Sequence, residues 1–414
     1  MTLPRTRRWL IVVALALSSH LASAQSPYKI LHAFTGGLDG GGTWSTPVLD
    51  QAGNLYGTTS GGGTDGYGVV FELTPQQDGQ WFETVVYDFP NPRTHKDPAS
   101  PFAGPILAPN GSLYGDTQLG GSYGFGAIFE LTPNMGGWDF SALYSFGAPG
   151  QLGCCPWSAL FRDVSDNLYG TGGGVAFKLS PSIGGWSEAV LHQFTGLNGD
   201  GYGPQAGVVS DTAGDLYGTT RSGGGSPACA DFGCGTVYKL IPVFDGDGEV
   251  WNENILHVFG FLKGDGATPG LGSLAIDKKS ALYGTTAIGG ANGYGAVYKI
   301  AQSSTGHWQE IILHSFRQND SNGFEPSGGV TLGPDGSLYG TTIAGGAQNC
   351  GCGVVYRLSP QPGGQWQYTV LHNFIGIDGA QPDANLTIDT QGNLYGTTLT
   401  GGPGGAGVVF ELTP

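Results

Sequence analysis

Short apolar stretches separated by glycine-rich turns recur along the whole chain. In the first unit, residues 46–50 and 54–59 are two apolar stretches joined by a turn, and residues 68–75 alternate between apolar and polar positions. A fourth stretch, residues 81–89, opens with Trp81. Alternation with a period of two residues, bounded by Gly, Asp and Asn, is typical of β-strands. Each unit therefore predicts four short strands, here called a, b, c and d in chain order.

Strand b carries the tripeptide Leu-Tyr-Gly, which recurs at intervals of 48 to 66 residues, about 55 on average. A repeat of this length is one supersecondary unit that cannot bury its apolar face alone. The repeated tyrosine is interpreted as structural, because seven copies of a catalytic residue would serve no single reaction. The seven copies are centred on Tyr56, Tyr114, Tyr169, Tyr217, Tyr283, Tyr339 and Tyr395.

The two ends of the repeat array are complementary. Residues 28–34 form a lone strand d, and residues 407–414 form a strand c with no strand d after it. Pairing these segments would close a ring and remove an open sheet edge. Four-stranded repeats arranged radially are the blades of a β-propeller. We therefore predict an all-β, seven-bladed β-propeller, closed by the N-terminal strand pairing with the C-terminal blade. A stacked solenoid is the alternative, but it would need capping repeats.

The first residues have the features of an export signal. Arg5, Arg7 and Arg8 precede an apolar run at residues 10–17, which is too short to span a bilayer, and Ala22-Ser23-Ala24 fits a cleavage site. The sequence thus predicts a cleaved signal peptide at residues 1–24 and a single propeller domain at residues 25–414. We expect an exported protein in the extracellular space, at the cell surface or in the periplasm, with no transmembrane span.

Composition and charge narrow the classes of partner. The chain holds 77 glycines and only 12% charged residues, which suits short strands and turns better than long helices. The formal net charge is −16, and removal of the arginine-containing leader makes the mature chain more acidic still. This balance argues against a nucleic-acid partner. We expect a monomer whose partner is a glycan or a protein at the cell exterior.

Six cysteines are candidates for disulfide bonds. An even number of cysteines in an exported chain indicates disulfides, although spacing alone does not define the pairing. Zinc binding is the alternative, but a structural zinc site usually needs two cysteine pairs at matched spacing, which this chain lacks. The candidates are Cys154, Cys155, Cys229, Cys234, Cys350 and Cys352.

The longer loops are expected on one face of the propeller, where the d-to-a and b-to-c connections meet. Function concentrates on loops that a rigid scaffold holds in place. A short b-to-c loop in the third repeat and a long one at residues 221–235 predict a notch between blades three and four, open or filled by the longer loop. Aromatic side chains on this face would either stack on sugar rings or cover the loops. These candidate ligand-binding residues are Trp44, Tyr67, Phe125, Trp157, Tyr202, Tyr294 and Phe324.

Recurring titratable residues have structural interpretations as well. One position of strand d holds histidine in five blades and tyrosine in two, and one histidine per blade cannot converge on a single ion. Aspartates in the d-to-a loops are either turn residues or a ring of cation ligands near the channel. The histidines are His32, His192, His257, His314 and His372, and the aspartates are Asp39, Asp200, Asp265, Asp320 and Asp378.

The remaining candidates concern calcium and the channel. Asp245, Asp247 and Glu249 alternate as carboxylates do in a calcium loop, but the glycine at the sixth position and the downstream glutamate are missing. No cofactor is expected, and Ca²⁺ is the alternative. Unlike polar residues occur on or near the innermost strands, but the sequence does not show that they meet. They are Asp383, Asn385, Gln205 and Arg162.

Residues 54–59 and 68–75, and again 393–398 and 407–414, resemble the Gloeo/Verruco (GloVer) tandem repeat of exported bacterial choice-of-anchor proteins. The resemblance spans nearly all of the expected mature chain, and the third repeat departs from it most, at residues 171–172. Members often carry a C-terminal surface anchor, and the sequence leaves open whether this chain is anchored. The resemblance implies no established activity, so no catalytic residue is carried over.

Two functional hypotheses follow from the sequence. The first is a non-catalytic exported repeat protein that binds a glycan or a protein on its glycine-rich looped face. The alternative is a channel-centred hydrolase, lactonase or lyase, assisted by calcium and motivated by the acidic d-to-a loops. No nucleophile motif or paired-carboxylate motif is evident, so no catalytic residue is assigned.

Overall fold

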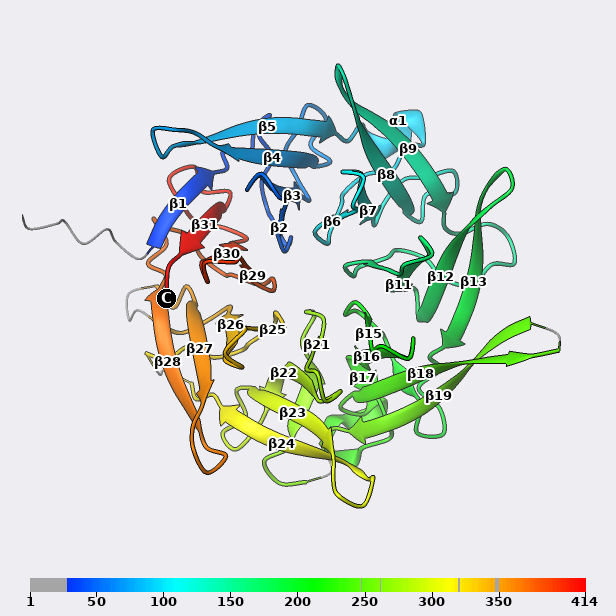
Figure 1. Cartoon of the computed structure of the whole chain (residues 1–414), viewed down its shortest axis with the longest axis vertical. Coiled ribbons are helices and arrows are strands. Elements are labelled where there is room, and N and C mark those ends of the chain that lie inside the picture. The colour runs from blue at the N-terminus through cyan, green and yellow to red at the C-terminus, as the bar shows by residue number, and fades with distance from the viewer. Residues whose placement is uncertain (1–27, 247, 261, 319–320, 347–349) are drawn as a thin grey trace, which may run out of the picture.

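The computed structural model describes residues 28–414, apart from 247, 261, 319–320 and 347–349. Seven sheets with four-stranded antiparallel cores surround a central axis (Figure 1), which confirms the predicted seven-bladed propeller. The predicted signal peptide, residues 1–24, lies outside the described residues. Among the described residues the only helical segments are α1 (Pro92–His95) and a 3₁₀ helix (Pro227–Phe232), and no described helix has the length and apolarity to cross a membrane.

The first four blades follow the predicted a-b-c-d order from the channel outward. The first blade is β2 (Val48–Leu49), β3 (Leu55–Thr59), β4 (Val69–Pro75) and β5 (Trp81–Asp88); the second is β6 (Ile106–Leu107), β7 (Leu113–Thr117), β8 (Ala127–Asn134) and β9 (Gly137–Ser145). The third is β10 (Phe161–Arg162), β11 (Leu168–Gly172), β12 (Val175–Ser182) and β13 (Gly185–Gln193); the fourth is β15 (Val209–Ser210), β16 (Leu216–Thr220), β18 (Thr236–Asp245) and β19 (Gly248–Val258).

The last three blades keep the same order. The fifth is β21 (Ala275–Ile276), β22 (Leu282–Gly289), β23 (Ala296–Gln302) and β24 (Trp308–Ser315); the sixth is β25 (Val330–Leu332), β26 (Leu338–Thr342), β27 (Val354–Pro360) and β28 (Trp366–Asn373). The seventh is β29 (Thr387–Ile388), β30 (Leu394–Thr397), β31 (Val408–Leu412) and β1 (Tyr28–Ala33). Three further strands lie in loops: β14 (Gly201–Tyr202) pairs with β17 (Ser222–Gly223), and β20 (Gly266–Pro269) pairs with β22.

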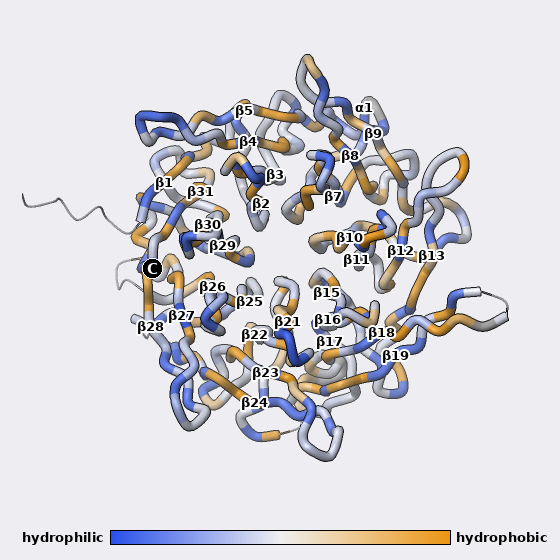
Figure 2. The backbone as a smooth tube through the Cα atoms, in the orientation of Figure 1, coloured by the Kyte–Doolittle hydropathy of each residue, from blue (hydrophilic) through white to orange (hydrophobic). Residues whose placement is uncertain are grey.

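The Leu-Tyr-Gly strand is the buried centre of each blade. All five residues of β3 are buried, and hydrophobic positions recur along the strands of every blade (Figure 2). The glycine is required by a close approach: a Cβ atom on Gly57 would lie 2.4 Å from the Phe71 ring, which comes from the neighbouring β4. The aromatic ring of strand c therefore lies over the glycine of strand b and fills the blade interior.

The ring closes as the complementary ends predict. β1 pairs antiparallel with β31, from Tyr28 opposite Leu412 to Ala33 opposite Val408. The Tyr28 ring stacks on His372 of the sixth blade at a centroid distance of 3.8 Å, and its hydroxyl donates to the Asp378 carbonyl at 2.6 Å. The N-terminal strand therefore completes the seventh blade and also contacts the sixth.

Near the channel, a threonine of strand b links each of five blades to the next. Thr58 Oγ1 donates to the Ala103 carbonyl at 2.9 Å, and across the ring closure Thr397 Oγ1 donates to the Ser45 carbonyl at 2.8 Å. Thr171, Thr285 and Thr341 make the same bond. In the second blade this position is Asp116, and complete burial raises the pKa of its carboxyl to about 7, although backbone N–H groups oppose the shift.

On the outside, neighbouring blades meet through one recurring pair of positions. The first position is the histidine or tyrosine near the end of strand d. It contacts strand d of the next blade, at the residue two positions after the tryptophan. In β1, which has no tryptophan, Tyr28 takes this second position. The contacts are aromatic stacks, hydrogen bonds or His–Glu pairs. They join Tyr87 with Phe140, Tyr144 with Glu188, His192 with Glu253, His257 with Glu310, His314 with Tyr368, and His372 with Tyr28.

The ring closure can be tested against an internal blade interface. Tyr28→Ala removes the stack on His372, and Tyr368→Ala removes the equivalent stack on His314. We expect each variant to lose about 3 kcal/mol of unfolding free energy, the usual cost of truncating a packed aromatic residue. Chemical denaturation of both variants measures it. If Tyr28→Ala had no effect while Tyr368→Ala was destabilising, β1 would not close the ring.

Asp116 should make the stability of the ring depend on pH. Its folded-state pKa of about 7 lies above the unfolded value, so its contribution to stability is complete below about pH 4 and is lost as the pH rises through 7. Asp116→Thr restores the residue of the other blades and should stabilise the protein at pH 8 by roughly 2–4 kcal/mol, but far less at pH 4. Denaturation curves at both pH values measure the difference.

The reverse substitution, Thr58→Asp, provides the matched control for this experiment. It places a carboxyl in the same buried position of the first blade, and it should destabilise the protein more at pH 8 than at pH 4. If Asp116→Thr and the wild type differed in stability by the same amount at both pH values, the raised pKa of Asp116 would not be the cause.

Candidate functional site

A cavity of about 310 Å³ occupies the central channel. In five blades, the residue four positions before the innermost strand lines this cavity, and we call this position the channel slot. In the first three blades this slot holds Trp44, Phe102 and Trp157, and all three side chains line the cavity. In the fifth and seventh blades the same slot holds Leu271 and Asp383, which also line the cavity.

A turn with left-handed backbone delivers these residues to the channel. Ser100 has a φ of 54° and Cys155 a φ of 48°, two residues before Phe102 and Trp157. Such a conformation costs a non-glycine residue of order 1–3 kcal/mol and needs support from its surroundings. The N–H of Ser100 donates to the Tyr67 carbonyl at 2.9 Å, and that of Cys155 to the Phe125 carbonyl at 2.7 Å. The loop of one blade thus fixes the channel residue of the next.

The three aromatic side chains form a continuous wall. The Trp44 and Phe102 rings are stacked at a centroid distance of 5.1 Å with an interplanar angle of 21°. The Phe102 and Trp157 rings meet edge to face at 5.2 Å. Trp157 is 38% exposed, so the wall is open to solvent at the mouth. We define Trp44, Phe102 and Trp157 as the aromatic arc.

Next to Trp44 in the ring, the seventh blade supplies a carboxyl and an amide to the same cavity. Burial raises the pKa of Asp383 to about 6, while hydrogen bonding by Ser327 and the positive charge of Arg221 act in the other direction. Asp383 Oδ1 is buried and has no hydrogen-bond partner among the described residues. Asp383 is also one of the residues that line the cavity, so a ligand there would meet its carboxyl group.

Asn385 is fixed by two neighbouring blades. Its Oδ1 accepts the Gly329 N–H at 3.0 Å, and its Nδ2 donates to the Ser273 carbonyl at 3.3 Å. The reach across the sixth blade requires glycine, because a Cβ on Gly329 would lie 2.8 Å from the amide and one on Gly272 would lie 2.2 Å from it. A single side chain of the seventh blade thus joins the fifth and sixth blades at the cavity.

The sequence-predicted aromatic residues separate into two groups. Trp44 and Trp157 converge on the cavity, whereas the other five are not among its lining residues. Phe125 lies against Gly147, where a Cβ would be 2.3 Å from its ring, and Tyr294 packs edge to face on Phe324. Tyr67 packs against the core between the first two blades, and Tyr202 is half exposed on β14. These five residues serve separate loops rather than one surface.

Phe102 was not among the predicted residues. Its signal was present in the repeat, since Phe102 and Trp157 each follow a proline and occupy the slot of Trp44. Asp383 and Asn385 were recognised as unlike residues of an inner strand, and the structure brings them together. Gln205 and Arg162 do not line this cavity; Arg162 is paired with Asp166. The long loop of the fourth blade holds β17 and the 3₁₀ helix, and no residue of that blade lines the cavity.

Of the two interpretations of the d-to-a aspartates, turn residues or a ring of cation ligands near the channel, the described residues fit the first. Asp39, Asp200, Asp265 and Asp378 each pair with a strand-d histidine, at 3.0 to 3.5 Å, away from the cavity lining. They also accept backbone N–H groups of their own loops, as in Thr195 N to Asp200 Oδ2 at 2.6 Å. Turn chemistry is therefore their observed role, because the loop needs an acceptor where its backbone reverses. Asp320 lies outside the described residues.

The predicted calcium loop is only partly described. Asp247 lies outside the described residues, as does the side chain of Asp245. Glu249 is bound by Lys178 of the third blade, with Oε2 and Nζ 2.7 Å apart. A basic partner already neutralises the one carboxylate of this set that the structure places.

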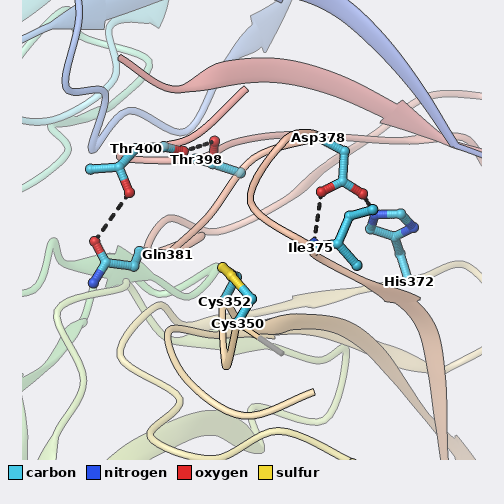
Figure 3. The surroundings of a disulfide bond; sticks show 8 residues. All are labelled: Cys350, Cys352, His372, Ile375, Asp378, Gln381, Thr398 and Thr400. Atoms are coloured by element: carbon cyan, nitrogen blue, oxygen red, sulfur yellow. Dashed lines mark hydrogen bonds and ion pairs between the residues drawn. A yellow bond between two sulfur atoms is a disulfide. The ribbon is translucent and has the colours of Figure 1, made fainter. Parts of the chain in front are cut away.

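Four of the six cysteines are paired, Cys229 with Cys234 and Cys350 with Cys352. Figure 3 shows the second disulfide beside the loop that carries Asp378 and Gln381. The other two candidates, Cys154 and Cys155, are free thiols. Adjacent residues joined by a trans peptide have Cα atoms about 3.8 Å apart, shorter than the usual separation in a disulfide, and the described chain has no cis peptide bond.

The cavity offers binding chemistry. Its lining contains one carboxyl, Asp383, one amide, Asn385, and hydroxyls such as Ser273, but no histidine. An apolar aromatic wall facing a few fixed polar groups is the usual composition of a small-molecule site.

Several solved structures match the chain at low sequence identity. They include a gluconolactonase from Xanthomonas campestris, with 16% identity, a TM-score of 0.39 and coverage of 73% of this chain and 82% of that one. A chain of a nidogen/laminin complex has 14% identity, a TM-score of 0.40 and coverage of 74% and 88%. The extracellular domain of BT4673 from B. thetaiotaomicron has 10% identity and a TM-score of 0.54, and the match covers 92% of this chain and 39% of that one. The last of these similarities concerns the fold alone, and the first two TM-scores are too low to carry an argument.

No curated protein matches the sequence. The model of the Gloeobacter/Verrucomicrobia repeat matches residues 19–230 and 228–414, which together include every blade. Each of the seven Leu-Tyr-Gly strands occupies the same place in its blade, and the match confirms the resemblance seen in the repeats. The chain therefore belongs to the Gloeobacter/Verrucomicrobia repeat family.

Proposed function

We propose that the protein is an exported, non-catalytic propeller that binds a carbohydrate in the mouth of its central channel. The observation that carries this proposal is that the aromatic arc, Asp383 and Asn385 line one cavity. Export is supported by the leader-like first residues and by the two disulfides, since such bonds persist in oxidising compartments. A cell-exterior glycan is the partner that suits this location.

The chemistry of the cavity supports a sugar in particular. A pyranose presents an apolar face of C–H groups and a rim of hydroxyls. The apolar face matches the exposed ring of Trp157 in the aromatic arc, and the hydroxyls match the Asp383 carboxyl group, which lines the same cavity. A volume of about 310 Å³ lies at the lower limit of ordinary ligand sites, and so suits one terminal sugar unit better than a folded protein surface.

The hydrolase, lactonase or lyase hypothesis has less support. General acid–base or nucleophilic chemistry needs at least two functional groups that cooperate at one reacting centre. The cavity lining supplies a single carboxyl and no histidine. The acidic d-to-a loops, which motivated that hypothesis, pair with histidines on the outer strands instead.

Truncation of the aromatic arc tests the binding surface. A screen of immobilised neutral glycans identifies the sugar, and isothermal titration of the soluble oligosaccharide gives its affinity. Trp157→Ala should weaken that affinity at least tenfold, about 1.4 kcal/mol, because the exposed ring supplies the stacking area. The matched control is Tyr202→Ala, which removes an aromatic side chain that is 50% exposed on β14 and is not among the cavity-lining residues; this variant should bind normally.

Two outcomes would contradict the carbohydrate proposal. One is binding that survives simultaneous replacement of Trp44, Phe102 and Trp157 by alanine in a folded protein. The other is binding of a quaternary ammonium compound such as choline in place of every neutral sugar, because an aromatic surface beside a carboxylate also suits a cation.

Sugar affinity should depend on the ionisation of Asp383. The charged carboxylate accepts hydroxyl hydrogen bonds more strongly than the neutral acid. Because burial raises the pKa of Asp383 to about 6, affinity should rise between about pH 5 and pH 7 and then level off. Titration across this range measures the change. Asp383→Asn should bind more weakly at pH 7 and show no such rise; a wild-type profile in this variant would exclude Asp383 from the site.

A further inference from the structure

A second kind of site lies far from the cavity, at the outer contact between the fourth and fifth blades. His257 is on β19, Asp265 follows in the d-to-a loop, and Glu310 is on β24 of the next blade. His257 Nε2 lies 3.3 Å from Asp265 Oδ1 and 3.9 Å from Glu310 Oε2. The three donor atoms all lie within 4.8 Å of one another.

The same arrangement recurs one blade earlier. His192 Nε2 lies 3.3 Å from Asp200 Oδ1 and 3.5 Å from Glu253 Oε2, and these donor atoms also cluster within 4.8 Å. A tetrahedral zinc ion with bonds of about 2.0–2.2 Å holds neighbouring donor atoms roughly 3.3–3.6 Å apart. The clusters therefore already have nearly the spacing of a coordination sphere.

The aspartates are held in a ligating orientation. Asp265 Oδ2 accepts the Gly260 N–H at 2.8 Å, which leaves Oδ1 directed at His257. Asp200 Oδ2 likewise accepts the backbone N–H and hydroxyl of Thr195, and leaves Oδ1 directed at His192. Such hydrogen bonds to the second oxygen are what orients a carboxylate ligand in metal sites.

The glutamates supply the independent observation that points to a ligand. The Glu310 side chain is only 9% exposed, and its Oε1 is buried with no hydrogen-bond partner among the described residues. Glu253 Oε1 is likewise buried without a hydrogen-bond partner among the described residues, and its side chain is 13% exposed. The neighbouring Asp265 side chain is 1% exposed, so two carboxyl groups are brought together out of water. Burial of that kind is costly unless a proton or a cation lies between the groups.

We propose that His257, Asp265 and Glu310, and equally His192, Asp200 and Glu253, bind a first-row divalent cation such as Zn²⁺ between adjacent blades. Each ion has three protein ligands, one imidazole and two carboxylates, and an open position toward solvent, since His257 is 15% exposed. Two ligands come from one blade and the third from the next. Each ion therefore joins the outer strands of two blades.

The remaining interfaces show that the residue at the glutamate position determines whether the histidine faces a carboxylate or an aromatic ring. Where the glutamate is replaced by Tyr368 or Tyr28, that ring stacks on the histidine of the preceding blade at 4.1 or 3.8 Å. At the ring closure, His32 and Asp39 lie 3.5 Å apart, but Glu83 does not complete a cluster of the same compactness among the described residues. We therefore expect two ions per chain.

The experiment titrates metal-free, full-length mature protein with Zn²⁺ against a chromophoric chelator, and follows thermal unfolding with and without the ion. The wild type should bind two ions and unfold at a higher temperature when loaded. Glu310→Tyr and Glu253→Tyr each copy the residue of another interface, and each should bind one ion; the double variant should bind none and show no thermal shift. Glu310→Gln and Glu253→Gln provide the same test if the tyrosine variants do not fold.

Glu188→Gln is the matched control, because Glu188 occupies the same position but faces Tyr144 and no histidine. It should retain both ions and the full thermal shift. Absence of binding by wild type at micromolar free Zn²⁺, Co²⁺ and Mn²⁺ would overturn the proposal. So would a double variant that keeps the wild-type stoichiometry, since the ions would then lie elsewhere.

Discussion

The propeller depends on how closely its blades approach one another around the channel. The buried threonine of strand b donates its hydroxyl to a carbonyl of the next blade, and the innermost strands must be small enough to permit that distance. A Cβ on Gly104 would lie 2.1 Å from the Thr46 carbonyl oxygen. Because this inner layer is so tightly packed, bulky side chains fit only at the channel mouth, which is where the aromatic arc lies. The cavity is thus a consequence of the way the ring is held together.

Most of the fold could be predicted because its determinants are local and repeated. Leu55, Tyr56 and Gly57 predict a buried strand by their alternation, and the same tripeptide marks all seven blades. Closure could be predicted as well, because a lone strand at one end of the array matches a missing strand at the other. What the repeat does not contain is the curvature of the ring. Residues at equivalent positions of different blades come together only because the ring curves. The sequence therefore could not predict that Trp44, Trp157 and Asp383 line one cavity.

The histidines show a second limit of reasoning from single repeats. One histidine per blade indeed does not converge on one ion. The neighbouring blade, however, supplies a further ligand group, because it places Glu253 against His192 and Glu310 against His257. The glutamate lies two residues after a tryptophan, a position with no obvious link to the histidine until the blades are set side by side. Interfaces between repeats, rather than repeats themselves, are where this chain varies its chemistry.

The location of β1 sets the order in which the ring can be completed. Residues 28–33 are made before any blade exists, yet their hydrogen-bonding partner is β31, at residues 408–412. Ribosomes and export channels deliver a chain from its N-terminus. The first six blades therefore have all their strands before the strand that pairs with β1 is present. The strand that is synthesised first is therefore the last to pair. The closed ring, and the cooperative stability that closure gives, can form only after β31 has emerged.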